Sequence, residues 1–320
     1  MHIHPQIDAL RGDDTPQRVA QGRMAQASAD WRADPTVAEV LRDVEAFATC
    51  RPLSECAALS ALFDEADAAR AFAAGFVARA ARALTEQPLG HVVERHFTDG
   101  TLSLLLLARA GNVALSLVAL DGAGLAAMPE ARSVDFAPTE MWEHVIAGTG
   151  EAELVECRSV AERRADLRRR TIALHPGKVI CRDSERQALV VRRVEGSLVS
   201  LRLQRRRARA GVTREFALAD GGQVHQAAAN PRDSRIEMML ALLGRMGRAD
   251  AAPLAAEIAR ETGSAALRWQ ALRETLALDT LTGFRALAAI AGDPADELHA
   301  PARGLRDQLV AAHPQLLGVC

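Results

Sequence analysis

A series of short apolar segments between residues 89 and 228 constrains the fold of this chain more than any other feature. Thr101–Leu107 and Val113–Leu120 are rich in leucine and valine, and the residues between them include Gly111 and Asn112. Short apolar runs bounded by Gly, Asn and Asp predict β-hairpins rather than helices. Further segments of this kind are 144–146, 152–157, 179–181, 188–194 and 198–203. Residues 89–228 are therefore predicted to form a mainly antiparallel sheet, closed as a β-sandwich or a jelly-roll-like barrel.

The residues before this region have a helical pattern. Residues 1–30 are polar and are expected to form a mobile leader. Asp34-Pro35 then combines an N-cap residue with a proline at the first helical position. Apolar residues recur at a spacing of three and four, which predicts one buried helix face: Val37, Val40, Leu41, Val44 and Phe47. A second stretch of the same period ends before Pro88, so 31–88 is predicted to be a helical N-terminal segment.

The last part, 229–320, is also predicted to be helical. Ser234-Arg235-Ile236-Glu237 has the pattern of a capping box, which predicts a helix start at Ser234. Further helices are expected after Asp250, after Ser264, and after Thr280 or Thr282, with a last helix over about 300–312. Trp269 is interpreted as a core residue. The fold class is thus α+β, with N-terminal helices, a central β domain and C-terminal antiparallel helices.

Two partial resemblances go with this division. The segment Leu-Arg-Trp-Gln-Ala-Leu-Arg-Glu at 267–274 lies in a stretch, 249–291, that resembles the stacked helix pairs of HEAT-type repeat proteins. The strand pattern of the middle region resembles a cupin barrel. A cupin metal site is built around a His-x-His and a following Glu. The only His-x-His here is His2-Ile3-His4, outside the middle region, so this sequence departs from the family where its metal would bind.

Four histidines of the middle region are the candidates for a metal site of another kind. His96, His144, His175 and His225 could hold one divalent metal if the barrel brought them together, since imidazole is the commonest transition-metal ligand. Their spacing does not itself indicate a site. Without a metal, hydrogen-bonded or exposed histidines are the expectation, and no cofactor is expected.

Other patterns bear on the compartment and on catalysis. No secretory signal or membrane span is visible, and the five cysteines form no Cys-x-x-Cys pair. This argues against a disulfide framework and predicts a cytoplasmic protein. The sequence contains no phosphate-binding P-loop, no Gly-x-Ser-x-Gly motif and no His-Glu-x-x-His motif. No catalytic residue is therefore assigned, which favours a protein that is not an enzyme.

Charge is distributed unevenly along the chain. Residues 158–214 contain 17 basic residues and five acidic ones, a net charge of +12, although the net charge of the whole chain is -2. Residues 160–170 are predicted to form a basic helix. Strand alternation places Arg202 on the polar face of 198–203. These patterns predict a binding patch of ten arginines: Arg163, Arg164, Arg168, Arg169, Arg170, Arg202, Arg205, Arg206, Arg207 and Arg209.

Several functions are compatible with this patch. A guanidinium group suits carboxylates and phosphates. The patch could dock on acidic parts of the same chain or of a second subunit, bind an acidic protein partner, or bind nucleic acid. The scarcity of aromatic residues makes nucleic acid the least favoured partner. The sequence therefore favours a binding, scaffold or regulatory protein that uses the patch and the C-terminal helix pairs. The alternative is a cupin-like barrel enzyme, or a protein that binds a small molecule or a metal inside the β domain.

Overall fold

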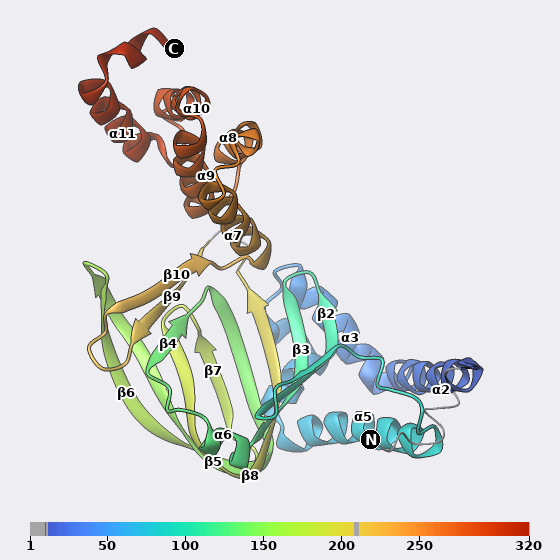
Figure 1. Cartoon of the computed structure of the whole chain (residues 1–320). Helices are drawn as coiled ribbons and strands as arrows, with labels where there is room; N and C mark the ends of the chain where they lie inside the picture. Colours follow the sequence, from blue (N-terminus) through green and yellow to red (C-terminus); the bar gives the residue numbers. More distant parts are fainter. Residues whose placement is uncertain (1–9, 11, 208–210, 320) are drawn as a thin grey trace. The chain divides into compact units, whose positions relative to one another are not determined.

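The computed structural model describes residue 10 and residues 12–207 and 211–319, which form two compact units (Figure 1). The first unit holds the residues up to Val134 together with 139–207 and 217–222. The second holds residues 135–138, 211–216 and the chain from Gln223 onward. Both helices and antiparallel sheet are present, as the α+β prediction requires. No helix of the described residues is long and apolar enough to cross a membrane.

Among the described residues, the first unit begins with four α-helices and one 3-10 helix: α2 (Thr15–Arg32), α3 (Pro35–Ala48), η1 (Leu53–Glu55), α4 (Ala57–Asp64) and α5 (Ala66–Glu86). The predicted start of α3 is confirmed, because the Asp34 side chain accepts a hydrogen bond from the Thr36 backbone N–H. The predicted mobile leader is wrong from Thr15 onward, where α2 begins. This helix has a weak apolar pattern, and its buried residues are Ala20, Met24 and Trp31. Residues 1–9 and 11 lie outside the described residues.

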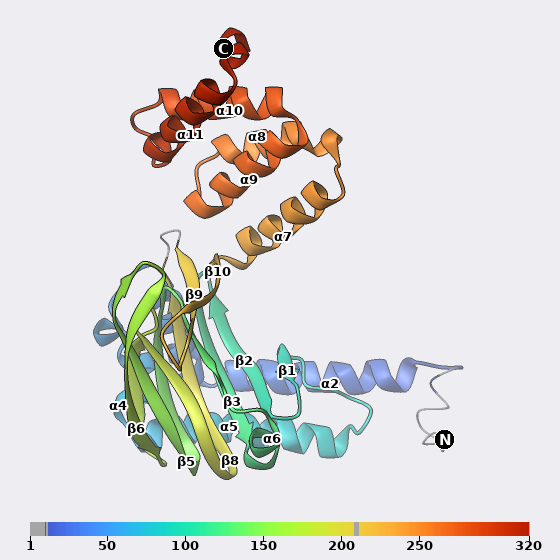
Figure 2. The ribbon, with the colours of Figure 1, turned by 60° about the vertical axis from the view of Figure 1, so that its left-hand side comes forward.

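The first unit also contains a seven-stranded antiparallel sheet. Its main path runs β1-β2-β3-β8-β5-β6, and β7 also pairs with β5. The strands are β1 (His96–Thr98), β2 (Leu102–Ala110), β3 (Val113–Asp121), β5 (Thr139–Ala161), β6 (Arg164–Leu174), β7 (Val179–Asp183) and β8 (Gln187–Arg206). The short helix α6 (Gly122–Ala127) follows β3. Figure 2 shows the strands edge-on, with β5 and β8 the longest ribbons.

Two sequence-based predictions fail in this sheet. The basic helix expected over 160–170 is wrong, since these residues form the end of β5, a tight turn at Glu162-Arg163 and the start of β6. The separate segments expected over 144–146 and 152–157 are also wrong, because β5 runs through both of them and through Gly148 with shifts of register. Gly148 has a φ of +83° and lies so close to β8 that a Cβ atom would be 2.0 Å from the Ser197 carbonyl oxygen. The glycine is required by this close approach between strands.

The register of the sheet determines which residues meet the helices. Leu115, Leu203 and Trp142 lie opposite one another on β3, β8 and β5, so their side chains share a face. This face packs on α3, α4 and α5 in one hydrophobic core, where Phe47 lies against Trp142 with ring centroids 5.5 Å apart. The N-terminal helices and the large sheet are thus stabilised by the same buried surface, although the sequence-based boundary at residue 89 separates them.

The second sheet has the strand order β10-β9-β4, formed by β4 (Ser133–Phe136), β9 (Val212–Ala217) and β10 (Gln223–Ala228). The helices that follow are α7 (Pro231–Arg245), α8 (Ala252–Arg260), α9 (Ala265–Leu278), α10 (Thr280–Gly292) and α11 (His299–Ala312), with the 3-10 helices η2 (Ala249–Ala251) and η3 (Pro314–Val319). They surround their own core, which includes Leu272 and Phe284.

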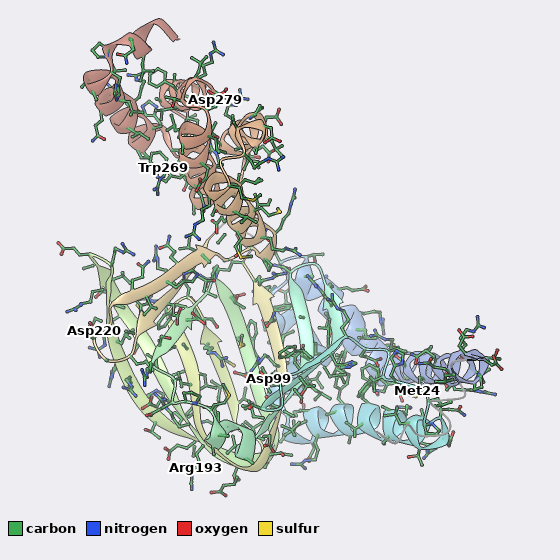
Figure 3. The ribbon with its side chains drawn as sticks, viewed as in Figure 1. Met24, Asp99, Arg193, Asp220, Trp269 and Asp279 are labelled. Atoms are coloured by element: carbon green, nitrogen blue, oxygen red, sulfur yellow. The ribbon has the colours of Figure 1, made fainter. Side chains whose placement is uncertain are left out.

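The predicted helix starts in this part have different outcomes. Ser264 caps α9 as expected, since its side chain accepts from the Leu267 N–H. The capping box at Ser234 is wrong, because α7 begins three residues earlier with Asn230 as its N-cap. The fourth helix is capped by Asp279 rather than by either threonine. Trp269, on α9 (Figure 3), packs partly buried against the core. The resemblance to HEAT repeats stays a prediction.

Candidate functional site

The arginines of the predicted patch lie mainly on the large sheet, and β5 supplies glutamates that pair with several of them. Glu143 is the most buried of these glutamates, with 7% of its side chain exposed. Arg202 of β8 donates to its Oε1 atom from Nε at 2.9 Å and from Nη2 at 2.6 Å. Arg182 of β7, whose side chain is 8% exposed, donates to Oε2. A single carboxylate is thus held between two guanidinium groups from the strands on either side.

The charge state of Glu143 follows from these contacts. Burial alone would raise the pKa of this carboxyl, but the charges and hydrogen bonds of Arg202 and Arg182 outweigh burial and hold it below its ordinary value. The cluster therefore contains two positive charges and one negative charge near neutral pH. Buried guanidinium groups are costly without a carboxylate partner, so Glu143 is needed to keep both arginines inside the sheet.

A second glutamate of β5 has the same arrangement. Glu153 accepts from Arg192 of β8 at 2.6 Å and from Arg169 of β6 at 2.7 Å. Burial alone would raise the pKa of Glu153, but the hydrogen bonds and charges of Arg169 and Arg192 outweigh burial and hold the pKa below its ordinary value. Arg192 also lies 3.5 Å from Glu130, which is exposed. The repeat of this arrangement along β5 shows that the sheet uses arginine and glutamate as cross-strand pairs.

Three more arginines of the patch are paired within the first unit. Arg205 contacts Glu140 at 2.7 Å, and its guanidinium carbon lies 4.1 Å from the centre of the Phe47 ring. Arg207 pairs with Asp183 at 2.8 Å and with Glu185 at 2.6 Å. Arg164 lies 3.1 Å from Asp220, which Figure 3 labels at the edge of the sheet.

The remaining arginines of the patch differ in accessibility. Arg163 is in the β5–β6 turn, and Arg168 and Arg170 are exposed on β6, which is an edge strand of the sheet. Arg206 is half-buried at the end of β8. Arg209 lies outside the described residues. Charged residues on an edge strand also prevent the sheet from pairing with other chains, which gives Arg168 and Arg170 a structural role.

The structure does not bring the four candidate histidines together. His144 is 1% exposed in the helix-facing core, where its Nδ1 atom lies 2.7 Å from the Leu62 carbonyl oxygen. His96 is exposed on β1, and His175 is exposed next to Pro176. His225 lies on β10 in the second unit. Among the described residues, no three His, Cys, Asp or Glu side chains are grouped as a metal would require.

An open groove of about 630 Å³ on the first unit is a site that the sequence did not indicate. Helix α5 contributes Val77 and Leu84 to its wall, and the large sheet contributes apolar residues from four strands. The complete lining is Val77, Leu84, Gly90, His91, Val92, His96, Phe97, Thr98, Ser103, Leu104, Leu105, Leu117, Val118, Ala119 and Val199. Its volume lies in the range of ligand pockets, roughly 300–1,000 Å³.

The polar side chains that line the groove are two histidines, one threonine and one serine. His91 follows α5, and its backbone is held to α2 by hydrogen bonds of its N–H and C=O with the Gln21 side chain, at 3.1 and 3.2 Å. His96 and Thr98 are on β1, and the Thr98 hydroxyl lies 3.0 Å from that of Ser103 on β2. Two imidazoles and two hydroxyls therefore accompany a wall that is otherwise almost wholly apolar. Of the four predicted histidines, His96 alone lines this groove.

Comparisons with known proteins match parts of this chain only. No family model and no curated protein matches the sequence. Among solved structures, HutD from Pseudomonas fluorescens SBW25 is 17% identical with a TM-score of 0.25, over 38% of this chain and 59% of that chain. A cupin superfamily protein from Desulfitobacterium hafniense DCB-2 is 14% identical with a TM-score of 0.23, over 35% of this chain and 83% of its own. KdgF from a Halomonas species is 17% identical with a TM-score of 0.23, over 36% and 88%.

One of these matches is a cupin superfamily protein, but the resemblance of the middle region to a cupin barrel stays a prediction. The chain spans less than two thirds of HutD. All three TM-scores lie well below 0.5. The activities of these proteins therefore do not transfer to this chain, and its function must be argued from its own residues.

Proposed function

We propose that this protein binds a small apolar molecule in the groove between α5 and the large sheet. The observation that carries this proposal is the groove of about 630 Å³, whose walls are mainly valine and leucine side chains. Two of the apolar residues that line the groove are exposed, Val77 by 53% and Phe97 by 55%, so a ligand could cover apolar surface that now faces water. A concave apolar surface is typical of ligand pockets, because the free energy of binding is favourable when a ligand removes apolar surface from water.

The polar residues of the groove define the class of ligand further. The imidazoles of His91 and His96 and the hydroxyls of Thr98 and Ser103 can donate hydrogen bonds to a carboxylate or a hydroxyl group. The ligand class is therefore an apolar molecule with one polar end, of which a medium-chain fatty acid is a simple example. Such a function needs no metal and no catalytic residue.

This proposal keeps the small-molecule alternative predicted from the sequence rather than the scaffold interpretation, but it places the site between α5 and the sheet instead of inside the β domain. Five of the ten arginines of the predicted patch are paired with acidic groups of the same chain: Arg164, Arg169, Arg202, Arg205 and Arg207. Ion pairs within the chain thus account for half of the patch, which supports a scaffold function less than the groove supports ligand binding.

A titration tests the proposal. The fluorescent probe anilinonaphthalene sulfonate is added to the protein and then displaced with decanoic acid. Val77→Trp places a large ring at the α5 wall of the groove, so we expect it to weaken binding of both compounds by about tenfold or more. The matched control is Val19→Trp, because Val19 is a valine of similar exposure, 57%, on α2 outside the groove. The proposal is wrong if neither compound binds, or if the two variants bind equally well.

A further inference from the structure

Helix α7 presents an unusual face to solvent. Met238, Met239 and Leu242 of α7 and its C-cap residue Met246 lie on one side of the helix, and they are 63%, 54%, 58% and 58% exposed. We call these four residues the methionine stripe. Single exposed apolar residues are common on protein surfaces, but a continuous stripe along one helix face indicates an interaction surface. Methionine is frequent on such surfaces, because its flexible side chain adapts to a partner.

The opposite face of α7 already has its partners. Leu240 is buried in the core of the helical region, and Ile236 packs against the same core. The Glu237 carbonyl accepts a hydrogen bond from the Gln270 side chain of α9 at 3.0 Å, and the Glu237 carboxylate accepts from the Ala228 N–H. The inner face therefore accounts for the folding of α7, and it leaves the methionine stripe without a role in the fold.

Arginines accompany the stripe. Arg232, Arg235 and Arg245 are exposed, and helical periodicity places them on the same side of α7 as the stripe. The acidic residues of the helix, Asp233 and Glu237, are half-buried on the other side. Arg232 and Arg235 lie near the N-terminus of α7, where the helix dipole already favours anions and disfavours cations. Arg235 donates from Nε to the Pro231 carbonyl oxygen at 3.1 Å, and its Nη groups remain available to an anionic partner.

We propose that the methionine stripe of α7 docks an amphipathic helix of another protein that carries acidic residues beside its apolar face. The stripe would bury the apolar side chains of that helix, and Arg232, Arg235 and Arg245 would pair with its carboxylates. This surface lies outside the groove, so the proposal is independent of the proposed ligand.

Two other occupants fit less well. A second copy of α7 packed antiparallel would bring Arg235 of one copy near Arg245 of the other, and like charges facing each other are unfavourable. An anionic membrane would attract the arginines. However, Arg235 lies in line with the stripe, so inserting the stripe to the depth of an interfacial helix would bury its guanidinium group.

Fluorescence anisotropy with a synthetic peptide tests the proposal on the full-length protein. The peptide is a helix of about five turns with leucines on one face and glutamates beside them, and a second peptide has lysines in place of the glutamates. We expect the acidic peptide to bind and the basic one not to. Met239→Ser combined with Leu242→Ser should weaken binding of the acidic peptide about tenfold or more, as loss of central interface residues does.

Control variants separate the stripe from general stickiness. Leu254→Ser removes an apolar side chain of α8 that is 61% exposed and lies outside the stripe, so it should leave peptide binding unchanged. Arg235→Glu combined with Arg245→Glu should reverse the preference, so that the basic peptide binds instead. Because all these residues are exposed, the thermal midpoint should change little in any variant.

Several results would overturn the proposal. It is wrong if the acidic peptide does not bind, if it binds equally well to the double serine variant, or if both peptides bind alike. It is also wrong if light scattering shows a dimer that the serine variant abolishes. The same holds if the protein binds equimolar phosphatidylserine and phosphatidylcholine vesicles through the stripe and does not bind the peptide.

Discussion

At the scale of single residues, Glu143 shows why the net charge of a sequence segment does not give the charge of the surface that it forms. The segment 158–214, with its net charge of +12, does not include Glu140, Glu143 and Glu153, which lie earlier in the sequence on β5. The antiparallel register brings these glutamates beside Arg205, Arg202 and Arg192 of β8. A count along the chain cannot show such pairs, because the partners are about 40 to 65 residues apart in sequence. Alternation along the strand predicts that Arg202 lies on the polar face of β8, but it does not predict that Glu143 lies on the same face and pairs with it.

Replacing Glu143 tests the energetic role of this cluster. Glu143→Gln keeps the shape of the side chain but leaves the buried Arg182 and the partly buried Arg202 without a carboxylate. We expect it to lower the free energy of unfolding by about 3 to 5 kcal/mol, the usual cost of breaking a buried ion pair from one side. Urea unfolding measures this. Glu151→Gln is the control, because Glu151 is exposed on the same strand and should change stability by less than about 0.5 kcal/mol. An equal effect of the two substitutions would contradict the structural role of Glu143.

The same carboxyl predicts how stability depends on pH. The pKa of Glu143 is lower in the folded protein than its ordinary value of 4.5. Its contribution to stability is therefore complete above about pH 5.5 and is lost as the pH falls through the lowered folded pKa. Urea unfolding from pH 7 down to about pH 3 should show the difference between the natural protein and Glu143→Gln shrinking below the ordinary pKa. A difference that stays constant over this range would mean that the charge of Glu143 does not stabilise the fold.

At the scale of elements, helices were easier to predict than strands. The N-cap of helix α3 and the spacing of three and four between its apolar residues both lie within a short stretch of sequence, so they can be recognised without knowledge of the rest of the fold. The long strands β5 and β8 were predicted in pieces, because glycines that allow bulges resemble glycines that form turns. Conversely, the β5–β6 turn at Glu162-Arg163 contains no Gly, Asn or Pro, and the surrounding residues favour helix in isolation. Pairing between strands overrides that local preference.

The groove was not predicted either, since its lining comes from segments as distant as Val77 and Val199. Its one signal was the run of leucines in β2, which puts apolar residues on both faces of a strand.

A substitution in the β5–β6 turn is predicted to stabilise the protein, whereas most substitutions destabilise proteins. Glu162 and Arg163 have φ values of +48° and +67°, and this conformation is costly for residues other than Gly, Asn and Asp. Replacing both, Glu162→Asn with Arg163→Gly, should raise the free energy of unfolding by about 1 kcal/mol, because Asn-Gly suits a two-residue hairpin turn. Thermal unfolding measures the change.

The control for this prediction is another turn. Arg186→Gly changes an exposed residue between β7 and β8 that does not have a positive φ. There glycine relieves no strain and adds freedom to the unfolded chain, so this variant should be slightly less stable. If both variants lose stability, the side chains of Glu162 and Arg163 contribute more than their backbone conformation costs.

At the scale of the whole molecule, the two compact units have separate hydrophobic cores. Leu203 is fully buried between the large sheet and the N-terminal helices, and Leu272 is fully buried among the C-terminal helices. Units with separate cores can unfold separately. Differential scanning calorimetry of the full chain should therefore resolve two transitions. Leu203→Ala should lower the midpoint of one and Leu272→Ala the midpoint of the other, each by an amount equivalent to about 2 to 5 kcal/mol.

Decanoic acid should raise the midpoint of the transition that Leu203→Ala lowers, because the groove belongs to that unit and a ligand stabilises the unit that binds it. A single transition that both substitutions lower equally would show that the two cores unfold as one.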